Sequence, residues 1–183
     1  MLKAIIYNIC FALSLLGLTL SFEKAYSSDD LFEQHHKMMM EAIRTCNFDR
    51  IKRLTATPYI EINKDILNGF SYLDSALAVQ GCTDDQKIAI IKILLDNGVN
   101  PEGGRNSSIH PVFLYAMTYM PRNALKVIDM LVSHGADVNL KINGHGGYAS
   151  LLANYGNGPP QVTASEVMEI LKYLDKAGLN LSS

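Results

Sequence analysis

The side chains that could carry out chemistry do not form a catalytic or metal-binding pattern in this sequence. His35 and His36 are neighbours, and on a helix their rings would point about 100° apart, so they would not jointly hold one metal ion. Asp74 with Asp84 or Asp85 is not a credible acid/base pair. No phosphate loop, dinucleotide-binding glycine pattern, nucleophile elbow or paired-cysteine zinc motif occurs. We therefore expect no catalytic residue, no metal site and no cofactor, and the protein is not expected to be an enzyme.

Three further histidines have simple explanations. His134 precedes Gly135, where a partial positive charge suits the C-terminal end of a helix. His110 lies in a polar loop and is not expected to be a ligand. His145 stands between glycines, in a position that suits contact with a partner but that turn chemistry also explains.

The elements that must position these residues are helices. Ala124–Asn139 reads ALKVIDMLVSHGADVN, with apolar residues three and four apart, which predicts a helix with one broad buried face. Gly135 follows where a helix needs a left-handed residue at its C-terminal end. Similar sequence patterns recur roughly every 40 residues, at Ile88–Asn100, at Val167–Asn180 and, more weakly, at Ile51–Asn63. Such a period predicts stacked helical repeats.

Each of these helices is expected to follow a partner helix, and local signals mark several helix starts. The expected partner helices are Leu31–Cys46, Tyr72–Gln80, Val112–Tyr119 and Tyr148–Asn154. In the first, Met38, Met39, Ala42 and Ile43 form the expected apolar stripe, which is followed by a turn at 47–49 and a short helix, Arg50–Leu54. Thr83-Asp84-Asp85-Gln86 and Thr163-Ala164-Ser165-Glu166 are predicted capping boxes, and Pro121 suits the first turn of a helix.

The ending His134-Gly135-Ala136-Asp137-Val138-Asn139 resembles the second half of the ankyrin repeat. The family's other signature, T-P-L-H-x-A, is poorly matched, since Ser71–Ala76 keeps only its Leu and Ala. The resemblance covers about Lys37 to the C-terminus. It implies an all-α, ankyrin-like solenoid of about four helix-turn-helix repeats, at approximately 31–63, 64–100, 101–139 and 140–183. Asp74 replaces the family's histidine and is expected to accept hydrogen bonds from the backbone of a neighbouring finger, the loop that joins two repeats.

The resemblance also implies that the protein binds another protein through finger tips and the inner-helix face. The expected partner-binding residues are Arg105, Asn106, Tyr115, Tyr119, His145 and Tyr148. Aromatic residues cluster in these regions, and about half of them are expected in the core. Nucleic acid is not an expected partner, because the formal net charge is −2 and no run of basic residues exceeds two. The protein is expected to be a monomer.

Residues 1–27 form a separate segment that resembles a secretory signal peptide. Lys3 precedes the nearly uncharged run Ala4–Phe22, and Ala25-Tyr26-Ser27 places small residues before a cleavage site. An uncleaved membrane anchor is the alternative reading, because this run nearly spans a bilayer. After cleavage we expect a protein of the periplasm or the extracellular medium, with residues 28–183 as its single domain.

Two cysteines remain after such cleavage, Cys46 and Cys82. In an exported protein they could form a disulfide. Equivalent positions in neighbouring repeats lie about 10 Å apart, too far for a disulfide, but these two positions are not equivalent. The sequence leaves the pairing open.

Taken together, these features predict an exported binding module, in its sharpest version an immunity or inhibitor protein that blocks a toxin or an enzyme. The alternatives are a secreted effector or envelope adaptor that engages another protein, and a ligand-binding protein or enzyme with an unrecognised site.

Overall fold

A computed structural model describes residues 28–57, 62–63, 70–104, 112–140, 147 and 162–180. These residues form seven α-helices, one 3-10 helix and no strand, so the all-α fold class is confirmed for them. The helices are α2 (Ser28–Arg44), α3 (Phe48–Thr55), α4 (Tyr72–Ala78), α5 (Asp84–Asp96), α6 (Val112–Tyr119), η3 (Pro121–Asn123), α7 (Ala124–Ser133) and α9 (Ala164–Lys176). The expected signal peptide and the expected helix Tyr148–Asn154 lie outside the described residues.

The chain divides into two compact units, residues 1–37 and residues 38–183. The described part of the first unit is the beginning of α2, in which Lys37 and Glu33 form an exposed ion pair at 3.6 Å. His35, the first of the two neighbouring histidines, is buried, with only 3% of its surface exposed. None of the helices in the described residues is long and apolar enough to cross a membrane.

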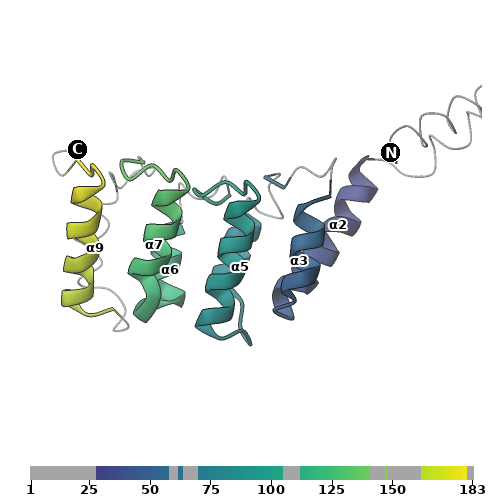
Figure 1. The fold of residues 1–183 in the computed structure, drawn as a ribbon, viewed down its shortest axis with the longest axis horizontal. Coiled ribbons are helices and arrows are strands. Elements are labelled where there is room, and N and C mark those ends of the chain that lie inside the picture. The colour runs from purple at the N-terminus through teal and green to yellow at the C-terminus, as the bar shows by residue number, and fades with distance from the viewer. Residues whose placement is uncertain are drawn as a thin grey trace, which may run out of the picture. The chain divides into compact units, whose positions relative to one another are not determined.

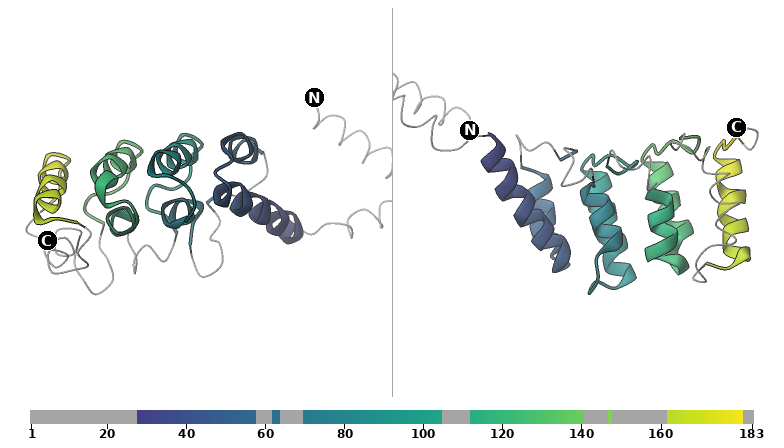
Figure 2. Two further views of the ribbon diagram at one scale, coloured as in Figure 1. Left: turned by 90° about the horizontal axis from the view of Figure 1, so that it is seen from below. Right: turned by 180° about the vertical axis from the view of Figure 1, so that it is seen from behind.

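In the second unit the helices lie in two rows (Figures 1 and 2). The outer row runs α3, α5, α7, α9, and each helix contacts the next. The inner row contains α4 and α6, which pack on each other and on α5 and α7 respectively. This arrangement buries the apolar stripes of both rows against one another.

The core lies between the rows and is made of the residues that helical spacing predicts. From the outer row it takes Ile90, Ile91, Leu94, Val127, Ile128 and Leu131, and from the inner row Leu73, Leu77, Phe113 and Met117. At the end of α2, Met39, Ala42 and Ile43 are buried as expected. Met38 is 39% exposed, so its assignment to the stripe is wrong.

Both predicted capping boxes are confirmed, and a third is present. The Gln86 N–H donates to Thr83 Oγ1 over 3.3 Å, and the Thr83 N–H donates to Gln86 Oε1 over 2.9 Å. Thr163 and Glu166 form the same reciprocal pair at the start of α9. The third box, Ser71 with Asp74, opens α4. These bonds satisfy backbone donors that a helix start would otherwise leave without partners.

Outer helices α5, α7 and α9 end in the same way. Gly98, Gly135 and Gly178 follow them with φ of +82°, +97° and +97°, as predicted for Gly135. The next N–H then bonds the carbonyl five residues back, for example Ala136 to Leu131 over 3.0 Å. This is the Schellman ending, in which a left-handed glycine turns the chain out of the helix. His134 occupies the C-cap of α7 as expected, with Nδ1 2.7 Å from the Met130 carbonyl.

Asparagine side chains link these turns to one another. Asn63 Nδ2 donates to the Gly98 carbonyl over 2.9 Å, while the Asn100 N–H donates to Asn63 Oδ1 over 2.6 Å. Asn139 makes the same two bonds to Gly178 and Asn180, at 2.9 and 2.7 Å. We call this two-bond contact the amide clasp. It requires one donor and one acceptor on the same side chain.

Between the turns that follow α5 and α7, which we call the middle joint, Glu102 occupies the position that an asparagine occupies in the two clasps. Its Oε1 accepts from the Asp137 N–H, as Asn139 Oδ1 accepts from the Asn180 N–H. Its Oε2 is buried without a hydrogen-bond partner. Burial raises the pKa of Glu102, and the bond from the Asp137 N–H only partly opposes that rise. An ionised carboxylate has no hydrogen to donate, so the middle joint lacks half of the clasp.

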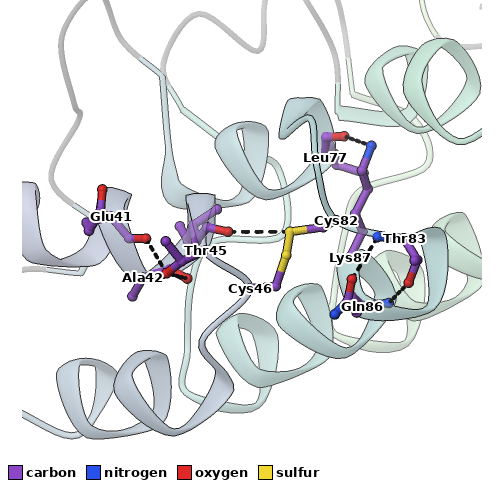
Figure 3. Close-up of a disulfide and its surroundings, with 10 residues drawn as sticks. Glu41, Ala42, Thr45, Cys46, Leu77, Cys82, Thr83, Gln86 and Lys87 are labelled. Carbon is purple, nitrogen blue, oxygen red and sulfur yellow. Dashed lines mark hydrogen bonds between the residues drawn. A yellow bond between two sulfur atoms is a disulfide. The ribbon is translucent and has the colours of Figure 1, made fainter.

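A buried lysine closes the short helix α4. Lys87 is 8% exposed, and its Nζ donates to the Leu77 carbonyl over 3.2 Å (Figure 3). The last carbonyls of a helix have no partner within it, so this bond satisfies one of them.

A disulfide joins Cys46 to Cys82, close to Lys87 (Figure 3). Their Cα atoms lie 6.0 Å apart, because both residues sit in loops whose course brings them closer than equivalent helix positions. Cys46 has a φ of +50°, which is unusual for a residue other than glycine. The bridge ties the loop between α2 and α3 to the loop before α5.

We predict that reduction of this disulfide lowers stability by about 2–4 kcal/mol, because the bond joins two positions 36 residues apart and so constrains the unfolded chain. Thermal melts with and without a reductant measure the effect. A Cys82→Ala variant is the control, since its melting temperature should not respond to the reductant. Equal melting of the parent under both conditions would contradict the prediction.

Replacing Glu102 by Gln should complete the middle clasp and raise stability by about 1 kcal/mol at pH 7. Because the pKa of Glu102 is raised on folding, its contribution is fully present below the unfolded value, near 4.5, and is lost as pH rises through the folded value. The advantage of the glutamine variant should therefore shrink towards pH 4.

Asn139→Asp is the matched control for Glu102→Gln. This change removes the donor from an intact clasp, so it should destabilise the protein at pH 7 and less so under acid conditions. Chemical denaturation at several pH values measures both variants. A Glu102→Gln variant no more stable than the parent at pH 7 would show that the middle joint does not need the donor.

Candidate functional site

The inner row differs from the outer row in its charges. Helices α4 and α6 read YLDSALA and VFLYAMTY and contain one charged residue, Asp74, and no basic residue. Helices α5, α7 and α9 each carry both acidic and basic residues. The exposed surface of the inner row is therefore poor in charge.

Three aromatic side chains gather on this charge-poor surface. Tyr115 and Tyr119 are four residues apart on α6, which places them on one face. Their rings stack with centroids 5.5 Å apart and planes 14° from parallel. Phe70, just before α4, meets Tyr115 edge to face at 6.5 Å. We call Phe70, Tyr115 and Tyr119 the aromatic strip.

The strip is accessible. Phe70 is 36% exposed and Tyr119 is 43% exposed, whereas Tyr115 between them is half-buried. The core-facing side of α6 carries Val112, Phe113, Ala116 and Met117, all of them buried. Because the core holds that face, α6 presents its two tyrosines on a fixed support. Burial first, and then the charges of Asp74 and Tyr119, raise the pKa of Tyr115, so its hydroxyl stays protonated at neutral pH.

Asp74, whose charge acts on Tyr115, is only 4% exposed. Its Oδ2 accepts from the Ser71 N–H at 2.7 Å, the Ser71 hydroxyl at 2.8 Å and the Gly104 N–H at 3.1 Å. The last bond confirms the expectation that Asp74 accepts from the backbone of a neighbouring finger. Oδ1 is buried and accepts no hydrogen bond.

Gly103 lies against this carboxylate and leaves no room for a side chain. A Cβ atom on Gly103 would stand 2.8 Å from Asp74 Oδ1, and its φ is +81°. The close approach and the backbone conformation both require glycine there.

A second feature is a hollow of about 630 Å³ between α7 and α9. It is lined by Pro121, Arg122, Leu125, Lys126, Asp129, Glu166, Glu169, Ile170 and Tyr173. The Tyr173 hydroxyl donates to Asp129 Oδ1 over 2.7 Å. Burial, together with this bond, raises the pKa of Tyr173 to about 12. The hollow thus mixes charges of both signs and holds a phenol that stays protonated.

The structure brings together two of the six predicted partner-binding residues, Tyr115 and Tyr119. Arg105, Asn106, His145 and Tyr148 lie outside the described residues, so their roles stay predictions. Phe70 was not selected from the sequence, because its contact with Tyr115 depends on how α4 packs on α6. The residues lining the hollow were also missed, since α7 and α9 are distant in sequence.

No group of three or more His, Cys, Asp or Glu side chains in the described part of the chain could hold a metal ion. In comparisons with known proteins, the chain matches no family model and no curated protein.

Proposed function

We propose that this chain is an exported, ankyrin-like solenoid that binds another protein through the aromatic strip and the fingers beside it. The observation that carries the proposal is the strip itself, in which exposed rings lie on a surface with no basic residue in α4 or α6. Protein interfaces are depleted of charge at their centre and enriched in aromatic residues, and tyrosine is common among residues that dominate binding energy.

The solenoid part of the proposal is supported by corresponding details at successive positions. The glycine ending occurs after three outer helices, and the amide clasp or its glutamate variant links the turns. In stacked repeats each segment contacts its neighbours, and the stack supplies an extended binding surface. Function does not follow from such a fold alone, so the binding site is argued from the strip.

Export is supported by the signal-like residues 1–27 and by the disulfide. Disulfides persist in oxidising compartments such as the periplasm and the extracellular space. Within this proposal, our sharpest version is an inhibitor or immunity protein that covers a toxin or enzyme with the aromatic strip. A secreted effector or envelope adaptor would use the same surface.

The export part predicts that residues 1–30, fused to a reporter active only outside the cytoplasm, give a signal. The mature protein should begin near Ser28, because small residues precede that position. Sequencing of the N-terminus measures this directly. Soluble cytosolic protein that still begins with Met1 would contradict export.

The binding part predicts that Tyr119→Ala weakens the complex by about 1–2 kcal/mol or more. Stability should change by less than about 0.5–1 kcal/mol, because Tyr119 is 43% exposed. The partner is first captured from an envelope fraction and identified by mass spectrometry, and its affinity for each variant is then measured.

Met168→Ala is the matched control for Tyr119→Ala, because Met168 is an exposed apolar residue on α9, 51% accessible and outside the strip. It should leave binding unchanged. If both variants bind like the parent, the interface is not the aromatic strip, and Arg105→Ala and Tyr148→Ala then test the fingers.

A further inference from the structure

The charge that acts on the aromatic strip from within α4 and α6 is negative. Asp74 is the only charged residue in α4 and α6, and no basic side chain forms an ion pair with it in the described part of the chain. Its carboxylate is 4% exposed, so water screens its charge less than that of an exposed carboxylate. Its hydrogen bonds come from backbone N–H groups and a serine hydroxyl, which are neutral donors. Among the described residues, no cation is therefore paired with this negative charge.

The rings add to this negative character. The faces of aromatic rings carry partial negative charge, and cations bind over them. Tyr119 is the most accessible ring of the strip, and the ring of Tyr115 stacks behind it. A cation placed on the strip would meet ring faces and the field of Asp74, both of which attract it. A carboxylate or phosphate in the same place would be repelled by both.

We propose that the aromatic strip binds a basic side chain of the partner, an arginine in preference to a lysine. This inference rests on the proposed function, since it specifies the chemistry of the partner at the same surface. Arginine is preferred because its guanidinium is planar, stacks on aromatic faces and sheds water more readily than an ammonium group. The partner is thus a protein that presents a basic segment to the strip.

The probe for this inference is a library of random peptides displayed on phage and selected on the immobilised full chain. Peptides retained by the parent chain are counter-selected on a Tyr119→Leu variant, which keeps apolar bulk but removes the ring. We expect the peptides that depend on Tyr119 to carry at least one arginine or lysine. Tyr119→Phe keeps a ring and should retain most of the binding.

Replacing arginine by citrulline in a selected peptide tests the charge without altering the protein. Citrulline keeps the shape of the side chain but is neutral. Loss of one stacked cation should reduce affinity about three- to thirtyfold. Replacing arginine by lysine should reduce affinity less than citrulline does.

Comparing Asp74→Asn with Glu169→Gln separates the local field at the strip from the overall charge of the protein. Each variant removes one negative charge, but only Asp74→Asn removes it near the strip. Glu169 lies on α9, outside the strip. Only the Asp74 change should weaken the arginine peptide. Asp74 also caps α4, so its variant is compared only if its melt shows a folded protein. If it does not fold, the citrulline peptide decides the matter.

Peptides that depend on Tyr119 but carry no basic residue, or that bind equally well with citrulline, would overturn this inference and leave the proposed binding surface standing. Peptides whose binding is unchanged by Tyr119→Leu and by Tyr115→Leu would overturn both. Equal weakening by Asp74→Asn and Glu169→Gln would show general charge attraction and would also overturn the inference.

Discussion

The amide clasp sets the distance between successive outer helices in the second compact unit. In this contact, a side chain from one turn bonds the turn that ends the next outer helix. A left-handed glycine is needed at each of these turns, and it brings a carbonyl and a nearby N–H to the same edge of the turn. Asn63 and Asn139 each engage both groups. Because these bonds join residues far apart in sequence, they fix the position of one helix relative to the next. The packed core then fills the space that the spacing allows.

The Asp74 carboxylate connects this scaffold to the candidate surface. It caps α4 through Ser71, accepts a hydrogen bond from the finger at Gly104, and its charge acts on Tyr115 of the aromatic strip. One side chain therefore serves helix initiation, loop placement and the electrostatic field of the surface. An uncharged acceptor could perform the first two tasks, but only a carboxylate supplies the third. Phe70 of the strip and the Asp74 carboxylate thus both lie at the start of α4, whereas the two tyrosines come from α6.

Much of the fold could be predicted because its signals are local, whereas the rest depends on tertiary structure. The glycine after α7 and the capping box at Thr83 each involve residues within one helix or turn. The box at Ser71 was missed because Asp stands where Glu or Gln is the usual signal. The disulfide depends on the path of two loops, and the addition of Phe70 to the strip required knowledge of how α4 meets α6. The amide clasps could not be predicted either, because they join residues from different turns, although the asparagines that form them recur in the sequence.

The separation of charge between the rows explains how the molecule can carry an exposed aromatic surface. The outer helices hold the mixed charges that keep a protein surface well hydrated, as in the Lys92–Asp96 pair on α5. The inner helices α4 and α6 carry few charges, and α6 exposes aromatic side chains instead. The two-row arrangement makes this division possible, because the pairs α4/α5 and α6/α7 each have one member in each row. The exposed aromatic side chains can therefore be changed with little effect on the core, provided that Asp74 and Gly103 beside it are kept.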